Sequence, residues 1–240
     1  MSGIQNAFGF MRSAASAAPG SQSYTSPGTY SWVAPSGVTS ASIVTVGAGS
    51  AFRNGGALSY KNNKSVTPGS SYTVFVAAGC ATARTYFCNT GLVSAGSLCA
   101  RTGDGGGNGG TGSCSGGGAG GYSGAGGAGV PCTTQGNAGA GGGGGSGAAL
   151  TINGGGGGGV GLFGQGSNGA GGTFGSQGGG GGSGGTSGTG PSGTCGGNGG
   201  LYGGGPGSGS NYNGVGGNGA VRIVWPGNTR KFPSTCVGSP

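Results

Sequence analysis

The chain has 240 residues, of which 75 are glycine, and its net charge is +8 because Lys and Arg total 9 against one acid. With Asp104 as the only acid and no His, paired-carboxylate catalysis, a Ser-His-Asp triad and a His-based metal site are excluded, so we expect no enzyme, no metal and no cofactor. The cations are scattered, which argues against a nucleic-acid partner, and no apolar run is long enough for a membrane span.

Residues 1–20 are interpreted as an N-terminal attachment segment or tail. They carry no cation before their short apolar stretch and therefore make a poor signal peptide. Ile4, Phe8 and Met11 stand at helical spacing, as in a short amphipathic anchor that docks on a larger assembly. A disordered tail is the alternative interpretation.

Short antiparallel strands are expected between residues 22 and 79. Tyr30, Trp32 and Ala34 recur at every second position, which is the period of a strand. Further runs rich in β-branched or aromatic residues are 42–46, 58–60 and 72–76. Pro, Gly or Asn bounds each run, and Asn62 and Asn63 are expected to end the run that holds Leu58 and Tyr60.

A last strand is expected at residues 220–225, with Val221, Ile223 and Trp225 on one face. The other apolar strands all precede residue 80, so the simplest core joins this last strand to the N-terminal ones. The expected fold class is mainly β with irregular structure. In it, residues 21–101 and 220–240 form a small antiparallel β-sandwich into which residues 102–219 are inserted.

The inserted block holds 60 of the glycines, against 13 before it and 2 after it. Collagen is excluded because glycine does not recur at every third position and proline is scarce, and the runs are too short and irregular for silk-like packing. Disorder is the compositional default. We favour a bundle of polyglycine II helices, in which about ten glycine runs alternate with short islands and bond to neighbouring runs.

The seven cysteines include no Cys-x-x-Cys pair, so a zinc site is not expected. They are candidates for three disulfides between the tips of the bundle, with one thiol left over, and would then indicate an oxidising environment. Reduced thiols packed as small apolar groups are the alternative, and the connectivity stays open. The candidates are Cys80, Cys88, Cys99, Cys114, Cys132, Cys195 and Cys236.

The islands are the expected binding positions, because a rigid array of rods holds its loops at fixed places. The longest island is 80–103. Side chains of the islands would contact sugar rings or a protein surface, or else cap the ends of the bundle. The receptor-binding candidates are Arg84, Tyr86, Phe87, Tyr122, Phe163, Phe174, Tyr202 and Tyr212.

Three flanking segments resemble the glycine-rich domain of bacteriophage tail-fibre and virion proteins. They are SQSYTSPGTYSWVAPSGV at 21–38, YKNNKSVTPGSSYTV at 60–74, and GAVRIVWPG at 219–227 followed by RKFPS at 230–234. The interrupted glycine runs are similar to those of the distal tail-fibre adhesins of T-even-like phages. That family's fold is a polyglycine II sandwich with variable receptor-binding loops at its tip. The cysteine-rich island at 80–103 is not part of the family pattern.

The resemblance implies a virion protein that has no catalytic residues and binds a host-surface glycan or protein together with other virion proteins. A homo-oligomer is a further expected partner. An alternative is a self-assembling virion or extracellular filament or decoration protein, in a virion or on a cell surface. A third is an ice-binding protein, which is less favoured because the sequence lacks regular rows of small residues.

Overall fold

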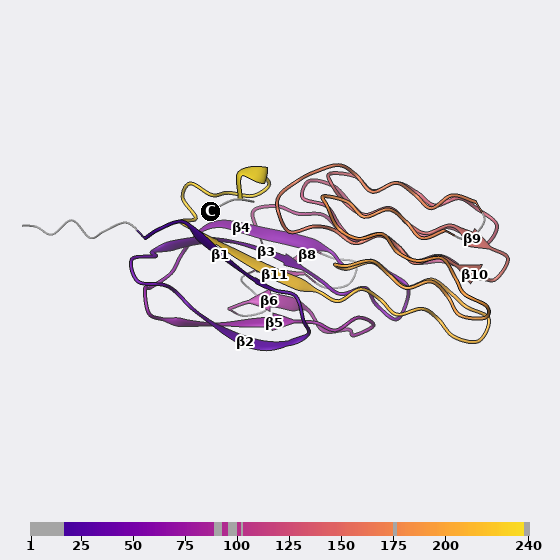
Figure 1. The fold of residues 1–240 in the computed structure, drawn as a ribbon, viewed down its shortest axis with the longest axis horizontal. Coiled ribbons are helices and arrows are strands. Elements are labelled where there is room, and N and C mark those ends of the chain that lie inside the picture. Colours follow the sequence, from indigo (N-terminus) through magenta and orange to yellow (C-terminus); the bar gives the residue numbers. More distant parts are fainter. Residues whose placement is uncertain (1–16, 89–92, 96–99, 102, 175–176, 238–240) are drawn as a thin grey trace, which may run out of the picture.

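The computed structural model of the protein describes residues 17–88, 93–95, 100–101, 103–174 and 177–237. The structure is mainly β, and helix within these residues is limited to one 3-10 turn, η1 (Thr235–Val237), so no described helix is long enough to cross a membrane (Figure 1). The strands are β1 (Gly20–Tyr24), β2 (Gly28–Val33), β3 (Ser40–Val46), β4 (Leu58–Ser65), β5 (Ser71–Val76), β6 (Thr85–Phe87), β7 (Val93–Ala95), β8 (Ala100–Arg101), β9 (Ala149–Leu150), β10 (Asn153–Gly154) and β11 (Ala220–Trp225).

Two larger antiparallel sheets contain most of the strands. One has four strands in the order β1-β11-β3-β4, and the other has five in the order β2-β5-β6-β7-β8. β11 lies between β1 and β3, so Ile223 pairs with Gln22 on one side and with Ile43 on the other. The expectation that the last strand joins the N-terminal strands is therefore confirmed.

The two sheets share a hydrophobic core. Trp32 of β2 is 1% exposed, and its ring lies 5.7–5.9 Å, centroid to centroid, from Tyr72, Phe87 and Trp225. The four-stranded sheet contributes Ala41, Ile43, Val221 and Ile223 to the same cluster. Val221, Ile223 and Trp225 thus face one way, as their alternate spacing predicted.

The opposite face of the four-stranded sheet is also covered. Val44 and Val46 of β3 and Val224 of β11 pack there against Tyr122, Val160 and Leu162 from the glycine-rich part, together with Phe232 and Val237 from the C-terminal segment. Every residue of β3 after Ser40 is buried. The run at 42–46 therefore lacks an alternation of apolar and polar residues, because both faces of its sheet are covered.

Two expectations about the strands are wrong. Asn62 and Asn63 do not end a strand: β4 runs through them, and its register with β3 shifts there, with Asn63 at a φ of 49°. An extra residue on one strand is accommodated as a bulge, which this left-handed Asn permits. The island at 80–103 is not a single loop, since it holds β6, β7 and β8 at the edge of the five-stranded sheet.

Between β8 and β11 the chain runs up and down in extended segments that lie side by side (Figure 1). Residues 154–160 are buried throughout, and every third one donates its N–H to the same neighbouring segment. Gly154 and Gly157 donate to Ser208 and Gly205, Gly155 and Gly158 to Ala148 and Gly145, and Gly156 and Gly159 to Thr189 and Thr186, at N···O distances of 2.8–2.9 Å. The run has a period of three, whereas a strand has a period of two.

The same run touches further segments at its α-carbons. A Cβ added to residues 154–159 would lie 1.9–2.4 Å from a backbone carbonyl oxygen of Cys114, Gln177, Asn198, Gly117, Gly180 and Leu201, in that order. These partners also recur with a period of three, and they lie on segments other than the ones that accept the hydrogen bonds. Close packing of backbones on all sides explains why this run is glycine.

The glycine-rich array is not confined to residues 102–219. The loop between β3 and β4 enters it, since Gly49 donates to Gly217, Gly55 to Gly110 and Gly56 to Gly203. The array is therefore tied to the sheets by backbone hydrogen bonds as well as by the apolar contacts of Tyr122, Val160 and Leu162.

Candidate functional site

Because the segments run up and down, successive loops fall at opposite ends of the array. We call the end that carries β9 and β10 the far end, and the end beside the four-stranded sheet the sheet end (Figure 1). Backbone and side-chain hydrogen bonds join the far-end loops to one another. These loops are 111–115, 130–136, 150–153, 173–174, 190–195 and 208–213, and the sheet-end turns are 122–124, 140–142, 161–168, 183–185 and 201–203.

A disulfide and a set of polar contacts hold the far-end loops in place. Cys114 and Cys132 are bonded across a sequence separation of 18. The Ser208 hydroxyl donates to the carbonyl oxygens of both Cys114 and Ile152, the latter at 2.8 Å. Asn153 donates from its side-chain nitrogen to Gly193 O at 3.0 Å and accepts at its oxygen from the backbone N–H of Ser210 at 2.9 Å.

The far end exposes large apolar side chains on this frame. Ile152 is 60% exposed, Phe174 57% and Tyr212 70%. No charged residue lies between Asp104 and Arg222, so the loops that carry these side chains are electrically neutral. Such a surface suits a partner that is recognised by apolar and aromatic contact.

The disulfide expectation is met in part. Among the cysteines whose side chains are described, Cys114 and Cys132 are bonded to each other, whereas Cys80, Cys88 and Cys195 are not in disulfides. Cys195 is exposed in a tight turn closed by reciprocal backbone hydrogen bonds with Ser192. The side chains of Cys99 and Cys236 lie outside the described part of the chain.

Two receptor-binding candidates are buried, so the expectation that they contact a receptor is wrong. Phe87 is 0% exposed, because its position in β6 directs it into the core between the sheets. Tyr122 is 1% exposed at a sheet-end turn, where its hydroxyl donates to Gly161 O at 3.1 Å and accepts from the N–H of Gly164 at 3.2 Å. Burial raises the pKa of Tyr122 well above its usual value, and the Gly164 hydrogen bond and Arg222 lower it by less.

Arg84 and Tyr86 lie on the five-stranded sheet rather than on the array. Arg84 is exposed just before β6, and the half-buried Tyr86 ring stacks on Phe75 at 5.4 Å between centroids. They are therefore separated from the candidates of the glycine-rich part. The structure brings Phe163 and Tyr202 together at the sheet end, and places Phe174 and Tyr212 on the far-end loops.

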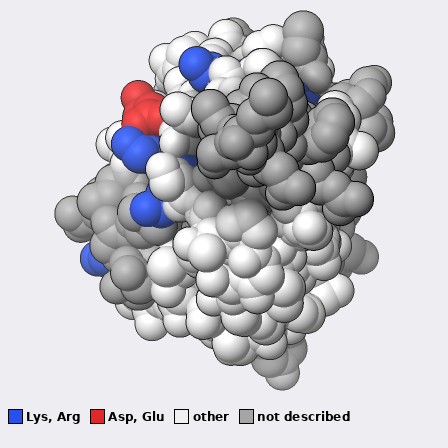
Figure 2. All heavy atoms as spheres, turned by 90° about the vertical axis from the view of Figure 1, so that its left-hand side faces the viewer, with Lys and Arg blue, Asp and Glu red and all other residues white. Residues whose placement is uncertain are grey.

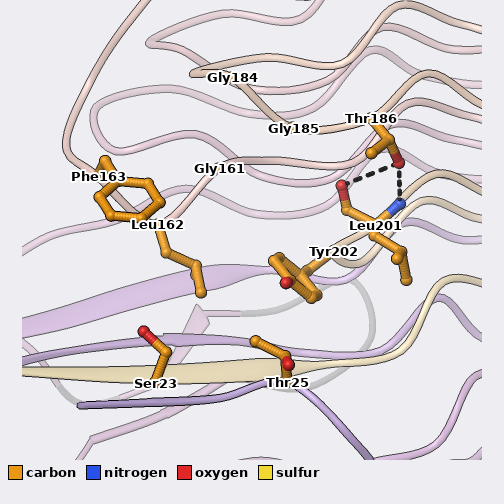
Figure 3. A pocket seen from close by; sticks show the side chains of 10 residues that line it. All are labelled: Ser23, Thr25, Gly161, Leu162, Phe163, Gly184, Gly185, Thr186, Leu201 and Tyr202. Atoms are coloured by element: carbon orange, nitrogen blue, oxygen red, sulfur yellow. Dashed lines mark hydrogen bonds between the residues drawn. The ribbon is translucent and has the colours of Figure 1, made fainter. Parts of the chain in front are cut away.

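Phe163 and Tyr202 line a pocket of about 280 Å³ at the sheet end, between the array and the edge strand β1 (Figure 3). Leu162 and Leu201 add apolar surface, and Ser23 and Thr25 point towards Leu162 and Tyr202 from the side of β1. Because side chains alternate along extended backbone, Ser23 in β1 and Thr25 directly after β1 face the array, while Tyr24 faces the core between the sheets. The sequence had not indicated Ser23 or Thr25, since a pocket wall from β1 depends on how the array docks.

A buried arginine supports the aromatic wall. Arg222 of β11 is 2% exposed, and its guanidinium lies 4.2 Å from the centroid of the Phe163 ring. It donates to Leu162 O and to the Ser21 hydroxyl, both at 3.3 Å. Desolvation lowers the pKa of Arg222, and nearby Arg230 lowers it further while Tyr122 opposes the change. Arg222 thus fixes the loop that carries Leu162 and Phe163.

The charged side chains that the structure describes are scattered on the face drawn in Figure 2. Figure 2 shows the Lys and Arg side chains at one end of the molecule as separate groups rather than as a continuous basic area. Asp104 accepts from Lys61 at 2.6 Å and from the N–H of Asn62 at 2.8 Å. Burial raises the pKa of Asp104, but these contacts outweigh it and leave that pKa below its usual value.

Within the described residues, no group of three or more His, Cys, Asp or Glu side chains is arranged to hold a metal ion. The candidate surfaces are the far-end loops and the sheet-end pocket. Comparisons of the chain with family models, with curated proteins and with solved structures give no match.

Proposed function

We propose that the protein is a non-enzymatic bacteriophage virion protein, a distal tail-fibre adhesin that binds a host-surface glycan or protein through the far-end loops. The observation that carries the proposal is the set of exposed apolar side chains on these loops, held by the Cys114–Cys132 disulfide and the Ser208 contacts. The start of the described chain, coloured indigo, lies at the end of the molecule opposite the far-end loops (Figure 1). In this proposal, the attachment segment expected at residues 1–20 docks on other virion proteins while the loops face a cell.

The proposed fold is a small β-sandwich that carries a bundle of polyglycine II helices. A polyglycine II helix has three residues per turn and no internal hydrogen bonds. The donors of residues 154–159 rotate among neighbouring segments with this period, and none of them bonds within its own run. The shared core of the two sheets supports the sandwich.

Rigid presentation of the loops supports a role in binding. Ordering a flexible loop on binding costs free energy, and a loop that is already fixed avoids that cost. The far-end loops are tied to one another by a disulfide and hydrogen bonds, so their apolar side chains occupy fixed relative positions.

Adsorption of virions to host cells tests the proposal. Ile152→Ser and Tyr212→Ala, made separately in the virion, are expected to lower the adsorption rate by about tenfold, because truncating a central contact residue costs more than ~1 kcal/mol of binding free energy. Val33→Ala is the matched control, since Val33 is 55% exposed on β2 of the five-stranded sheet. Unchanged adsorption of both far-end variants would contradict the proposal.

A self-assembling filament or decoration protein predicts a different result. The purified chain would then form large multimers on size-exclusion chromatography, and the far-end variants would leave adsorption unchanged. A monomer or a small closed oligomer that loses adsorption with Tyr212→Ala supports the adhesin.

A further inference from the structure

The sheet-end pocket has the chemistry of a small-ligand site that is separate from the far-end loops. Its apolar surface comes from Phe163, Tyr202, Leu162 and Leu201. Phe163 is 56% exposed although Arg222 stacks against it, so part of the ring stays accessible beside the cavity. The pocket is fixed on both sides, since Thr186 bonds through its hydroxyl to the backbone of Leu201 and Arg222 bonds to Leu162 O.

The polar groups of the pocket are hydroxyls. Within the described part of the chain, the hydroxyls of Ser23, Thr25 and Tyr202 make no hydrogen bond, and all three residues line the cavity. A hydroxyl both donates and accepts, so these groups can bond a ligand that carries hydroxyls of its own. No charged residue lines the pocket, which disfavours a ligand with a formal charge.

We propose that this pocket binds one neutral pyranose ring. A pyranose has an apolar C–H face and a rim of hydroxyls, which match the aromatic and leucine surface and the unbonded Ser23 and Thr25 hydroxyls. The volume of about 280 Å³ is at the lower limit for ligand pockets, which suits a single ring rather than an extended glycan. The inference rests on the proposed function only for the source of the sugar, as a unit of a host-surface glycan.

Binding of free sugars to the purified full-length chain tests the inference. The neutral probes are D-glucose, D-galactose and N-acetyl-D-glucosamine, and the charged probes are D-glucuronic acid and D-glucosamine. Saturation-transfer NMR and calorimetric titration are expected to show millimolar binding of at least one neutral probe and no comparable binding of the charged ones.

Two pocket variants and one control locate the site. Phe163→Ala and Thr25→Val are each expected to weaken the binding of the neutral sugar by about tenfold, the first through lost ring contact and the second through a lost hydroxyl at nearly constant shape. Val33→Ala is the control, because Val33 is exposed to nearly the same degree, 55%, on β2, and neither lines the pocket nor lies on a far-end loop. Thermal unfolding of each variant verifies that it is folded.

The inference is overturned if no neutral probe binds, if charged probes bind equally well, or if both pocket variants bind as the unmodified chain does. Failure of the proposed function is a separate result. Ile152→Ser that leaves adsorption unchanged would contradict the far-end receptor site without affecting the sugar titration.

Discussion

The α-carbon of Gly158 faces the carbonyl oxygen of Gly180 so closely that a Cβ on residue 158 would lie 1.9 Å from that oxygen. Gly158 is buried and Gly180 is half-buried, and the N–H of Gly158 is bonded to Gly145 O on another segment. The obstructing oxygen belongs to the backbone, so it cannot move away from an added Cβ as the end of a flexible side chain could. Close packing therefore requires glycine at residue 158, whatever the φ angle of that residue.

Gly158→Ala is therefore expected to lower the free energy of unfolding by ~3 kcal/mol or more, since overpacking a well-packed interior costs ~1–3 kcal/mol even where side chains can adjust. Gly166→Ala is the matched control: its nearest neighbour would be Ser183 Cα at 3.1 Å, and residue 166 is exposed. Thermal and urea unfolding followed by circular dichroism measure both. Equal midpoints for the two variants would contradict the close-packed array.

The far-end disulfide gives a second prediction. Replacing Cys114 and Cys132 together by Ser is expected to lower stability by about 3 kcal/mol, the cost estimated for opening a loop of this length. For a chain of this size that corresponds to a fall in Tm of roughly 6–12 °C. Cys195→Ser is the control, because Cys195 is exposed and is not in a disulfide. If the double variant has the same Tm as the unmodified chain, the hydrogen bonds of Ser208 and Asn153 are enough to hold the far-end loops without the disulfide.

The strands rich in β-branched and aromatic residues were predictable, because their burial follows from their own composition. The short strands β6, β7 and β8 were not. Thr85 and Phe87 of β6 are buried, but they stand in an island of Ala, Thr, Ser and Cys with no apolar alternation beyond them. Their pairing depends on β5, to which Val74 and Phe75 contribute the partners. Nothing local in the sequence indicates that pairing.

The sequence also did not show which islands lie at the far end of the array and which lie at the sheet end. In an up-and-down array each turn sends the next island to the opposite end, so the assignment requires every turn to be recognised. One turn lies at residues 140–142, where Gly141 and Gly142 have φ values of 55° and 78° inside a glycine run. Because the turn and the run that follows it are both glycine, the composition does not show where the chain reverses direction. Phe163 and Phe174 therefore looked equivalent in sequence, although they lie at opposite ends.

Alkaline pH is expected to destabilise the protein through Tyr122. Its pKa is raised in the folded chain, so the folded state binds the phenolic proton more tightly than the unfolded state does. The contribution of protonated Tyr122 to folding stability is fully present below the pKa of tyrosine in the unfolded chain, about 10. It is lost as the pH rises from there towards the pKa of Tyr122 in the folded chain.

Tyr122→Phe removes this titration, and the drop in Tm between pH 9 and pH 11 is expected to be smaller in the variant. At neutral pH the variant is expected to be less stable by ~1–2 kcal/mol, because the N–H of Gly164 and the oxygen of Gly161 lose their partner. Tyr212→Phe, at a tyrosine that is 70% exposed, is the control. If the drop in Tm between pH 9 and pH 11 is the same in Tyr122→Phe as in the unmodified chain, Tyr122 is not the group responsible for the alkaline destabilisation.

The stacking of Arg222 on Phe163 is expected to couple the two residues energetically. Arg222 is buried and its contacts are uncharged acceptors and a ring, so its interaction with the ring is little screened by water. A double-mutant cycle with Arg222→Met and Phe163→Leu isolates this interaction. We expect a coupling free energy of about 1 kcal/mol, in the range for a partly desolvated cation over an aromatic ring.

Arg222→Met with Phe174→Leu serves as the control cycle, and it should be additive because Phe174 is on a far-end loop with no contact to the guanidinium. Urea unfolding of the four chains in each cycle gives the coupling as a difference of free energies of unfolding. Because Arg222 also bonds to Leu162 O, the loss of Arg222 should loosen the pocket wall. Arg222→Met is then expected to weaken neutral-sugar binding even though the arginine does not line the cavity. Additivity in both cycles would mean that the ring and the guanidinium are merely adjacent.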